Sequence, residues 1–572
     1  MRSMKIPLFL LLTTCLSLSS WSEPRIQLSA FSSGVRVGMT GEWQGKDRAE
    51  IACAQNEVES FQAVVTARDG NLRGVEAEVT PLRGERGEIP GDHIVLYREE
   101  YVRVRYSSPR ATEAPGLFPD PLIPFRDPYT GEPVRVPQWD DENAPKHRFG
   151  AAEFDLWQDQ HQPLWIDVIV PADAPAGVYR GEIRVRARNT ESVSLPIQLT
   201  VWDFALPAGP THENHFGGFG YVARYHNLER DSMEFQQLED RYAEMMAAHR
   251  INPPLPSRFL PQTAEDGSIL MTEDLDRQIT EFVNRLHVTN LEIPRAPFGD
   301  ASGADRPKAI RFYRSWYAYL DSKGWGARAY HYMLDEPNDA SEYERVRQLG
   351  ALLKAAEPRI RRLVVEQPYT QDPAWGVLDG AIDIWCPLFG FIEEESVKRV
   401  QAQGDDVWSY SALVQVAAGY HPRYAEVKND NPPYWEIDFP LTAYRIAPWL
   451  NRRYGITGLL YWSTVFWQAP RRDPWDDPGF RLRWNGDGAL FYPGGDAGIA
   501  GPIASLRLKA LRDGMEDYEY FVLLEQRGGK SAVDEIVRQA VPTWGSWKSD
   551  PDRLTDLRHR LAEEIVKRVK AK

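Results

Sequence analysis

Two adjacent carboxylates, Asp335 and Glu336, stand where the short apolar run 332–334 meets Pro337. An aromatic-rich run of strand length that stops at a proline is typical of a buried β-strand, and such strands seldom end in unpaired carboxylates unless something binds there. Two carboxyl groups at one strand end can donate and accept protons. The same residues also fit a helix N-terminus, with Asp335 or Asn338 as its cap. Taken alone, these residues leave both interpretations open.

The composition favours a soluble multidomain protein and argues against a nucleic-acid partner. The 572 residues predict two or three domains. Net charge is −15, from 82 acidic and 67 basic residues, and the two signs are interspersed, whereas a phosphate-binding surface needs a concentrated Lys/Arg stripe. With 19 Trp, 25 Tyr and 22 Phe, aromatic residues are numerous. A carbohydrate site, where sugar faces stack on aromatic rings, is one explanation and a large aromatic core is the other.

The first 22 residues form a separate unit. Arg2 and Lys5 precede the apolar run 6–12, and small residues flank a cleavage point after Ser22. This pattern predicts a secretory signal peptide and a secreted or periplasmic protein, because the apolar run is too short to span a bilayer. Lipid anchoring at Cys15 is the less favoured outcome, since the Thr before it is a poor cleavage residue.

No metal or cofactor site is predicted. Removal of the signal leaves only Cys53 and Cys386, which are far apart and favour two buried free thiols over a disulfide or a zinc site. No His/Asp/Glu spacing indicates a metal site, and no glycine-rich loop indicates a phosphate cofactor. His331 is more often a satisfied core histidine than a ligand.

Residues 23–207 carry a period-two pattern. Leu195, Ile197, Leu199 and Val201 recur at every second position, which predicts an antiparallel β-sandwich. The segment 109–148 is rich in Pro, Asp and Gly and is expected to be a long loop beside a neighbouring domain.

From residue 211 to 525 short apolar runs alternate with helical stretches, which predicts parallel β/α units. Eight candidate strands in roughly 250 residues match a (β/α)8 TIM barrel. They lie at 215–221, 251–255, 289–294, 329–334, 362–366, 381–387, 406–411 and 458–462. A Rossmann fold is disfavoured because the glycines at 217–220 lack the GxGxxG spacing. Residues 526–572 are expected to form a helical extension that packs on the barrel.

In a TIM barrel the substrate lies at the C-terminal ends of the strands. Polar and aromatic residues that end the predicted strands are therefore candidate substrate contacts. Those at the fourth to eighth strand ends are Tyr332, Glu366, Gln367, Trp385, Tyr410, Tyr461, Trp462 and Trp467. Each aromatic is singly more often core, but together at one rim they favour a sugar site.

Glycosidic cleavage normally needs an acid and a second carboxylate about 5 to 9.5 Å apart. Neighbouring strand residues point to opposite faces, so Asp335 and Glu336 can face one cleft only if the strand breaks, as Pro337 would allow. Glu366 is the remaining candidate for a second carboxylate. In the other solution the substrate's own 2-acetamido group attacks the anomeric carbon. One carboxylate then stabilises that group, and its neighbour, with a raised pKa, is the acid and base.

Several motifs, in this order along the chain, resemble glycoside hydrolase family 123 and its uncharacterised relatives. They are Asn56 to Gln62, Asp335-Glu336-Pro337, Tyr461-Trp462, Trp484 to Gly488, Tyr492-Pro493-Gly494 and Arg512 to Tyr518. The resemblance implies a β-sandwich followed by a TIM barrel, and a retaining exo-β-N-acetylgalactosaminidase that works through acetamido participation. It also implies that Asp335 stabilises the acetamido group and that Glu336 is the acid/base.

Asn485 and Asp487 are further candidate substrate contacts, and Tyr410 is a candidate donor to the acetamido oxygen. Asn-Gly and Asp-Gly also form tight turns, a role compatible with binding. We therefore expect a secreted, cofactor-free hydrolase of glycans with a terminal 2-acetamido sugar, of unspecified linkage, galacto or gluco preference and oligomeric state. Two alternatives remain: a two-carboxylate glycosidase with Glu366 as nucleophile on a sugar without an acetamido group, and a non-catalytic extracellular carbohydrate-binding protein.

Overall fold

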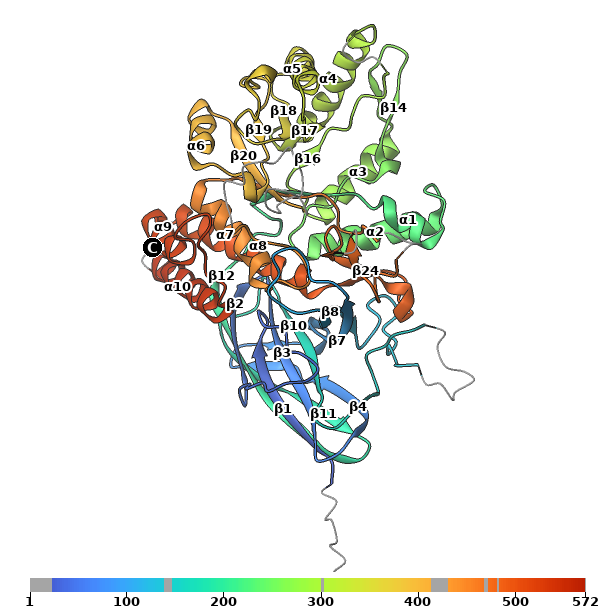
Figure 1. Cartoon of the computed structure of the whole chain (residues 1–572), viewed down its shortest axis with the longest axis vertical. Coiled ribbons are helices and arrows are strands. Elements are labelled where there is room, and N and C mark those ends of the chain that lie inside the picture. The colour runs from blue at the N-terminus through green and yellow to red at the C-terminus, as the bar shows by residue number, and fades with distance from the viewer. Residues whose placement is uncertain are drawn as a thin grey trace, which may run out of the picture.

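The structure is a computed structural model, and it describes residues 23–137, 147–299, 303–412, 431–467, 472–480 and 483–570. The predicted signal peptide and Cys15 lie outside the described residues. Strands dominate the N-terminal part, drawn in blue and cyan in Figure 1, and helices surround a second set of strands in the rest of the chain. Among the described residues, none of the helices is long and apolar enough to cross a membrane.

The N-terminal part contains two sheets around one apolar core, which confirms the predicted antiparallel sheet domain. One sheet has the order β1 (Arg25–Ser32), β3 (Glu57–Arg68), β10 (His161–Val170), β7 (Ile94–Val104), β8 (Gly116–Pro124). The other has the order β2 (Ala49–Gln55), β12 (Thr190–Ala205), β11 (Gly177–Ala187), β4 (Leu72–Val79), β9 (Phe154–Leu156), with β5 (Leu82–Gly84) and β6 (Glu88–Ile89) beside β11. Of these pairs, only β2 and β12 run parallel among the described strands.

The second part is built on a parallel sheet. Its order is β13 (Glu213–Phe216), β21 (Gly458–Tyr461), β20 (Asp406–Ser411), β19 (Ile384–Trp385), β18 (Arg361–Val365), β17 (Ala329–Asp335), β16 (Leu291–Glu292). The surrounding helices are α1 (Gly220–His226), α2 (Met233–Ala248), α3 (Glu273–Arg285), α4 (Arg306–Ser322), α5 (Ala340–Ala356), α6 (Glu394–Gln403), α7 (Thr442–Tyr454), α8 (Leu506–Gln526), α9 (Lys530–Ala540) and α10 (Pro551–Lys570). In Figure 1 helices α3 to α6 lie outside strands β16 to β20.

The expected complete eight-stranded barrel is not confirmed, because the described residues form seven parallel strands. The missing one is the predicted second strand at 251–255, which forms no strand. Pro253 and Pro254 have no N–H to donate, so this segment cannot make a full ladder.

Asparagine side chains bridge the resulting gap between β13 and β16. The Asn290 amide accepts from the Asn214 N–H at 3.1 Å and donates to the Asn214 carbonyl at 2.9 Å, as a neighbouring strand would. Asn252 donates its backbone N–H to the Asn214 side chain at 2.8 Å and its own amide to Asn290. Three side chains therefore replace one strand of backbone hydrogen bonds.

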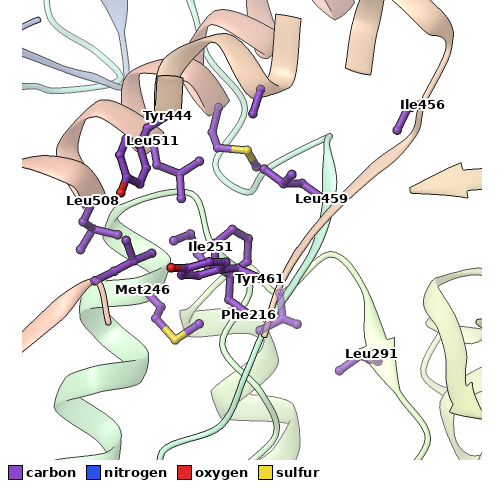
Figure 2. Close-up of a cluster of buried hydrophobic side chains, with 14 of the residues drawn as sticks. Phe216, Met246, Ile251, Leu291, Tyr444, Ile456, Leu459, Tyr461, Leu508 and Leu511 are labelled. Atoms are coloured by element: carbon purple, nitrogen blue, oxygen red, sulfur yellow. The ribbon is translucent and has the colours of Figure 1, made fainter. Parts of the chain in front are cut away.

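Apolar side chains fill the space between the sheet and its helices. Figure 2 shows part of this core, in which residues of β13, β21 and the segment at 251 meet residues of α2, α7 and α8: Phe216, Leu459, Tyr461, Ile251, Met246, Tyr444, Leu508 and Leu511. A smaller cluster, which includes Tyr330, Leu363, Val365, Cys386 and Tyr410, lines the inside of the parallel sheet. Cys53 and Cys386 are buried free thiols, as predicted.

Buried ion pairs join the N-terminal sheets to the C-terminal helices. Asp167 on β10 accepts from Lys509 at 2.7 Å and Arg512 at 3.2 Å on α8, and Glu57 accepts from Arg558 on α10 at 2.8 Å. Such pairs hold two surfaces in one register, because a partner left alone would be an uncompensated buried charge. Two of the sequence motifs, 56–62 and 512–518, thus meet at this junction. The domain limits 23–207, 211–525 and 526–572 stay a proposal.

Replacement of Asn290 by Ala should destabilise the protein by about 2 kcal/mol or more, because buried backbone groups of Asn214 and the amide of Asn252 lose their partner. Chemical denaturation measures this loss. Asn284→Ala on the exposed face of α3 is the matched control and should change the free energy of unfolding by less than about 0.5 kcal/mol. Equal losses for the two variants would contradict the bridging role of Asn290.

Candidate active site

An extra residue in β17 decides which side chains face the inside of the parallel sheet. Tyr332 pairs with Leu363 and Asp335 pairs with Val365, so three steps along β17 match two along β18, with the irregularity between Tyr332 and Leu334. Such a bulge re-aims the side chains that follow it. Tyr332, Leu363 and Val365 all line the interior. The bulge therefore brings Asp335 to the interior face, where regular alternation would have placed Leu334.

The backbone of Glu336 then leaves strand geometry. Its φ is +41°, in the left-handed region that costs a residue with a Cβ atom about 1 kcal/mol or more. Its N–H still bonds to the Val365 carbonyl at 3.1 Å. Its carboxylate accepts a hydrogen bond from the hydroxyl of Tyr410, whose ring lines the interior from β20. Both carboxylates therefore face the same interior, which a regular strand would forbid.

The alternative of a helix cap at Asp335 or Asn338 is wrong. Helix α5 begins at Ala340, and its cap is Asp339, whose carboxylate accepts from the N–H groups of Ser341 and Glu342 at 2.9 Å each. The helix thus takes its cap from a later residue. Asp335 and Glu336 remain available for another role.

Asp335 is exposed and is held by a neutral tyrosine. The Tyr332 hydroxyl donates to the Asp335 carboxylate at 2.9 Å. Burial, and then the negative charge of Asp335, raise the pKa of Tyr332 well above its usual range, so the phenol stays a donor. Burial and the same carboxylate raise the pKa of the Cys386 thiol, which stays uncharged.

Glu336 shares a small cleft with a second carboxyl group, that of Glu366, and with Gln367 and Tyr410. Glu366 is only 4% exposed. Its carboxyl group accepts from the Tyr343 hydroxyl at 3.3 Å and from the Gln367 amide. Burial raises the pKa of Glu366 well above its ordinary value, and the charge of Glu336 raises it further, against the lowering effect of the Tyr343 hydrogen bond. Burial and the charge of Glu336 therefore both favour the protonated form of Glu366.

Three other predicted contacts form a connected group at the end of β21. The Tyr461 hydroxyl and the Trp462 indole both donate to Asp487, at 3.2 and 3.3 Å. Gly486 and Gly488 have positive φ angles of 78° and 74°, so the loop is a tight turn. A Cβ atom at Gly488 would stand 2.2 Å from the Trp462 ring. The turn thus fixes the half-buried Trp462 ring, while Tyr461 lies fully in the core.

The remaining predicted contacts lie elsewhere, in buried structural positions. Trp385 packs in the core outside the interior and donates to Asp405 at 3.0 Å. Trp467 donates to the Phe491 carbonyl at 2.8 Å. Asn485 donates to the Tyr106 carbonyl and the Ser108 hydroxyl, both at 2.9 Å, and so ties a loop of the N-terminal part to the second part.

The structure also shows the hydrogen bonds of Tyr410 and His331, two residues for which the sequence predicts a role. Tyr410, expected to donate to the acetamido oxygen, donates to Glu336 in the structure. His331 is a satisfied core histidine, as expected: its ring lies 2.7 Å from the Ile293 carbonyl and 3.3 Å from the Tyr313 hydroxyl.

Sequence reasoning missed two interior residues, His215 on β13 and Glu292 on β16. The His215 Nδ1 lies 2.7 Å from the Tyr330 hydroxyl and 3.7 Å from the Glu292 carboxylate. A signal was present, because Glu292 is a charged residue inside the apolar run 291–293.

Comparisons with known proteins point to a family of enzymes. Residues 310–524, which contain both interior carboxylates, match the family model described as glycoside hydrolase 123, catalytic domain. The match defines a glycoside hydrolase acting on glycans. The match confirms the resemblance of the sequence motifs to glycoside hydrolase family 123. No curated protein matches the chain.

Among solved structures, the chain is similar to a family 123 glycoside hydrolase from Clostridium perfringens, studied for glycolipid glycan hydrolysis. The TM-score is 0.64 at 14% identity, over 96% of this chain and 98% of that one, so the two share a fold. A GH5 xyloglucanase from Bacteroides ovatus has a TM-score of 0.28 at 7% identity, over 86% of this chain and 100% of its own. A family 39 glycoside hydrolase from Bacteroides cellulosilyticus has 0.32 at 10%, over 82% of each chain.

The raised pKa of Glu366 predicts a pH-dependent stability difference. The folded protein keeps a proton on Glu366 that the unfolded chain releases above about pH 4.3, so this group makes wild type less stable as pH rises from there toward the folded pKa. Glu366→Gln has no such proton. Its stability relative to wild type should therefore increase between pH 5 and pH 8, by at most about 1.4 kcal/mol per pH unit.

Denaturant unfolding at pH 5, 6, 7 and 8 measures this difference. Glu265→Gln, at an exposed position of the same part of the chain, is the control and should show no trend with pH. A flat difference for Glu366→Gln would mean that Glu366 is ionised in the folded protein.

Proposed function

We propose that the protein removes a terminal 2-acetamido sugar, with β-linked N-acetylgalactosamine as its preferred substrate, by substrate-assisted retaining catalysis. The observation that carries this proposal is the placement of two adjacent carboxylates on one interior face beside a neutral Glu366. Adjacent acids suit a mechanism in which the substrate supplies the nucleophile. The predicted signal peptide supports action outside the cytoplasm.

In the first step Asp335 accepts a hydrogen bond from the acetamido N–H, and the acetamido oxygen attacks the anomeric carbon. Glu336 gives its proton to the glycosidic oxygen, so the bond to the leaving group breaks and an oxazolinium forms. In the second step the Glu336 carboxylate takes a proton from water, and the resulting hydroxide opens the oxazolinium ring with net retention. The hydroxyl groups of Tyr332 and Tyr410 hold the two carboxylates in place.

The two-carboxylate alternative is weaker, because it needs an ionised nucleophile. Glu366 is buried and keeps its proton, and a protonated carboxyl group is a poor nucleophile. The non-catalytic alternative does not explain why β17 tolerates a bulge and a left-handed Glu336. The half-buried ring of Trp462 is the proposed stacking surface for the sugar.

Three variants test the assignment on an aryl β-N-acetylgalactosaminide. Glu336→Gln should lower kcat/KM by about 1,000-fold, because it removes the proton donor, and Asp335→Asn should lower it by about 100-fold or more. Glu366→Gln should stay within about tenfold of wild type, since Gln resembles the protonated acid. If Asp335→Asn and Glu336→Gln kept wild-type rates, the proposal would be wrong. A loss in Glu366→Gln as large as that in Glu336→Gln would favour the two-carboxylate mechanism.

A further inference from the structure

A cavity of about 280 Å³ is lined by residues of β13 and β16 and shares no lining residue with the cleft of Glu336 and Glu366. Its polar lining includes His215, Glu292, Arg295 and Tyr330, and its apolar lining includes Pro253, Pro254, Leu255, Leu260 and Leu291. The cavity lies where the second strand of a complete barrel is missing. The non-strand segment at 251–255 forms part of its wall.

Tyr332 connects this cavity to the catalytic carboxylates. Its ring centroid is 5.5 Å from that of His215, and its hydroxyl donates to Asp335 at 2.9 Å. Glu336 instead faces the cleft formed with residues of β18 and β20. Tyr332 thus links Asp335 to His215 in the cavity lining, while the neighbouring Glu336 lines the other space.

The roles of the two carboxylates give the direction of a bound sugar. Under the proposed function, Glu336 acts at the C1 oxygen and Asp335 at the C2 acetamido group. The ring then continues past Asp335 toward Tyr332 and His215. The C3 and C4 hydroxyl groups therefore point to the cavity. Among the described residues of its lining Glu292 is the one carboxyl group, and it lies 3.7 Å from the His215 Nδ1.

The side chains of the cavity suit the hydroxyl groups of an uncharged sugar. The side chain of Glu292 is 37% exposed to solvent and that of His215 is 20% exposed, so both can contact a ligand. Burial lowers the pKa of His215 to about 4, which leaves a neutral imidazole at neutral pH. Burial of the carboxyl group raises the pKa of Glu292 to about 7, although the positive charge of Arg295 lowers it. Donors and acceptors without a large net charge, set against apolar walls, are typical of sugar recognition.

We propose that this cavity receives the C3 and C4 edge of the terminal 2-acetamido sugar, and that Glu292 binds the C4 hydroxyl group and determines the choice between galacto and gluco configuration. This inference rests on the proposed function, because the direction of the sugar follows from the roles of Asp335 and Glu336.

Binding of thiazoline mimics of the oxazolinium tests the inference without turnover. The ligands are the galacto thiazoline, its gluco epimer at C4 and the 4-deoxy compound, measured by calorimetry with wild type, Glu292→Ala and Glu292→Gln. For wild type, loss of the C4 hydroxyl should weaken binding by about tenfold or more. For Glu292→Ala that penalty should fall below about twofold, and Glu292→Gln, which keeps the shape and a hydrogen-bonding group, should retain part of it.

Glu265→Ala, an exposed carboxylate outside the cavity, removes the same charge and should keep the full tenfold penalty. A purely structural role of Glu292 would weaken all three ligands equally, and an unchanged 4-deoxy penalty in Glu292→Ala would overturn the inference while leaving the proposed function intact. If none of the thiazolines bound wild type, the proposed function would fail, and this inference with it.

Discussion

The proposed function depends on a break in β17, because a regular strand would send Asp335 and Glu336 to opposite faces of the sheet. The break has two parts: an extra residue before Asp335 and a left-handed backbone at Glu336. Packing holds it in place, since the Met333 side chain is fully buried in the core outside the interior. Strain of this kind persists where surrounding structure over-determines it. Under the proposed function it brings two carboxylates to one sugar site.

The surroundings then give the carboxyl groups of the site different roles. Tyr332 stays a neutral donor to Asp335, and burial favours the protonated form of Glu366. Glu336 is thus the remaining carboxylate of its cleft that can exchange a proton with a substrate. A site with Glu336 as proton carrier and no ionised nucleophile beside it is incomplete for direct displacement. It is complete if the substrate provides the attacking oxygen, and this links the geometry of β17 to the 2-acetamido sugars.

Local patterns predicted much of this structure. Period-two alternation marked the antiparallel sheets, and the ends of apolar runs located Asp335, Glu336 and Glu366. The prediction of a second strand at 251–255 is wrong. The hydrogen bonds there come from the side chains of Asn214, Asn252 and Asn290, and a hydrophobic pattern does not reveal such side-chain bonds. Trp385 and Trp467 were expected at the rim of the barrel but lie in the core. The end of a strand in the sequence does not tell on which face of the sheet a side chain lies. The bulge and the left-handed Glu336 depend on contacts with β18 and β20, and these are non-local.

The central claim is that the substrate's acetamido oxygen is the nucleophile. Its most direct test is kcat/KM for aryl β-glycosides that carry N-acetyl, N-fluoroacetyl, N-difluoroacetyl and N-trifluoroacetyl groups. Each fluorine withdraws electrons from the amide oxygen, so the account predicts a steep fall along the series, parallel for wild type and Glu366→Gln. A rate that does not change along the series, with Glu366→Gln inactive, would contradict the account and assign the nucleophile to the protein.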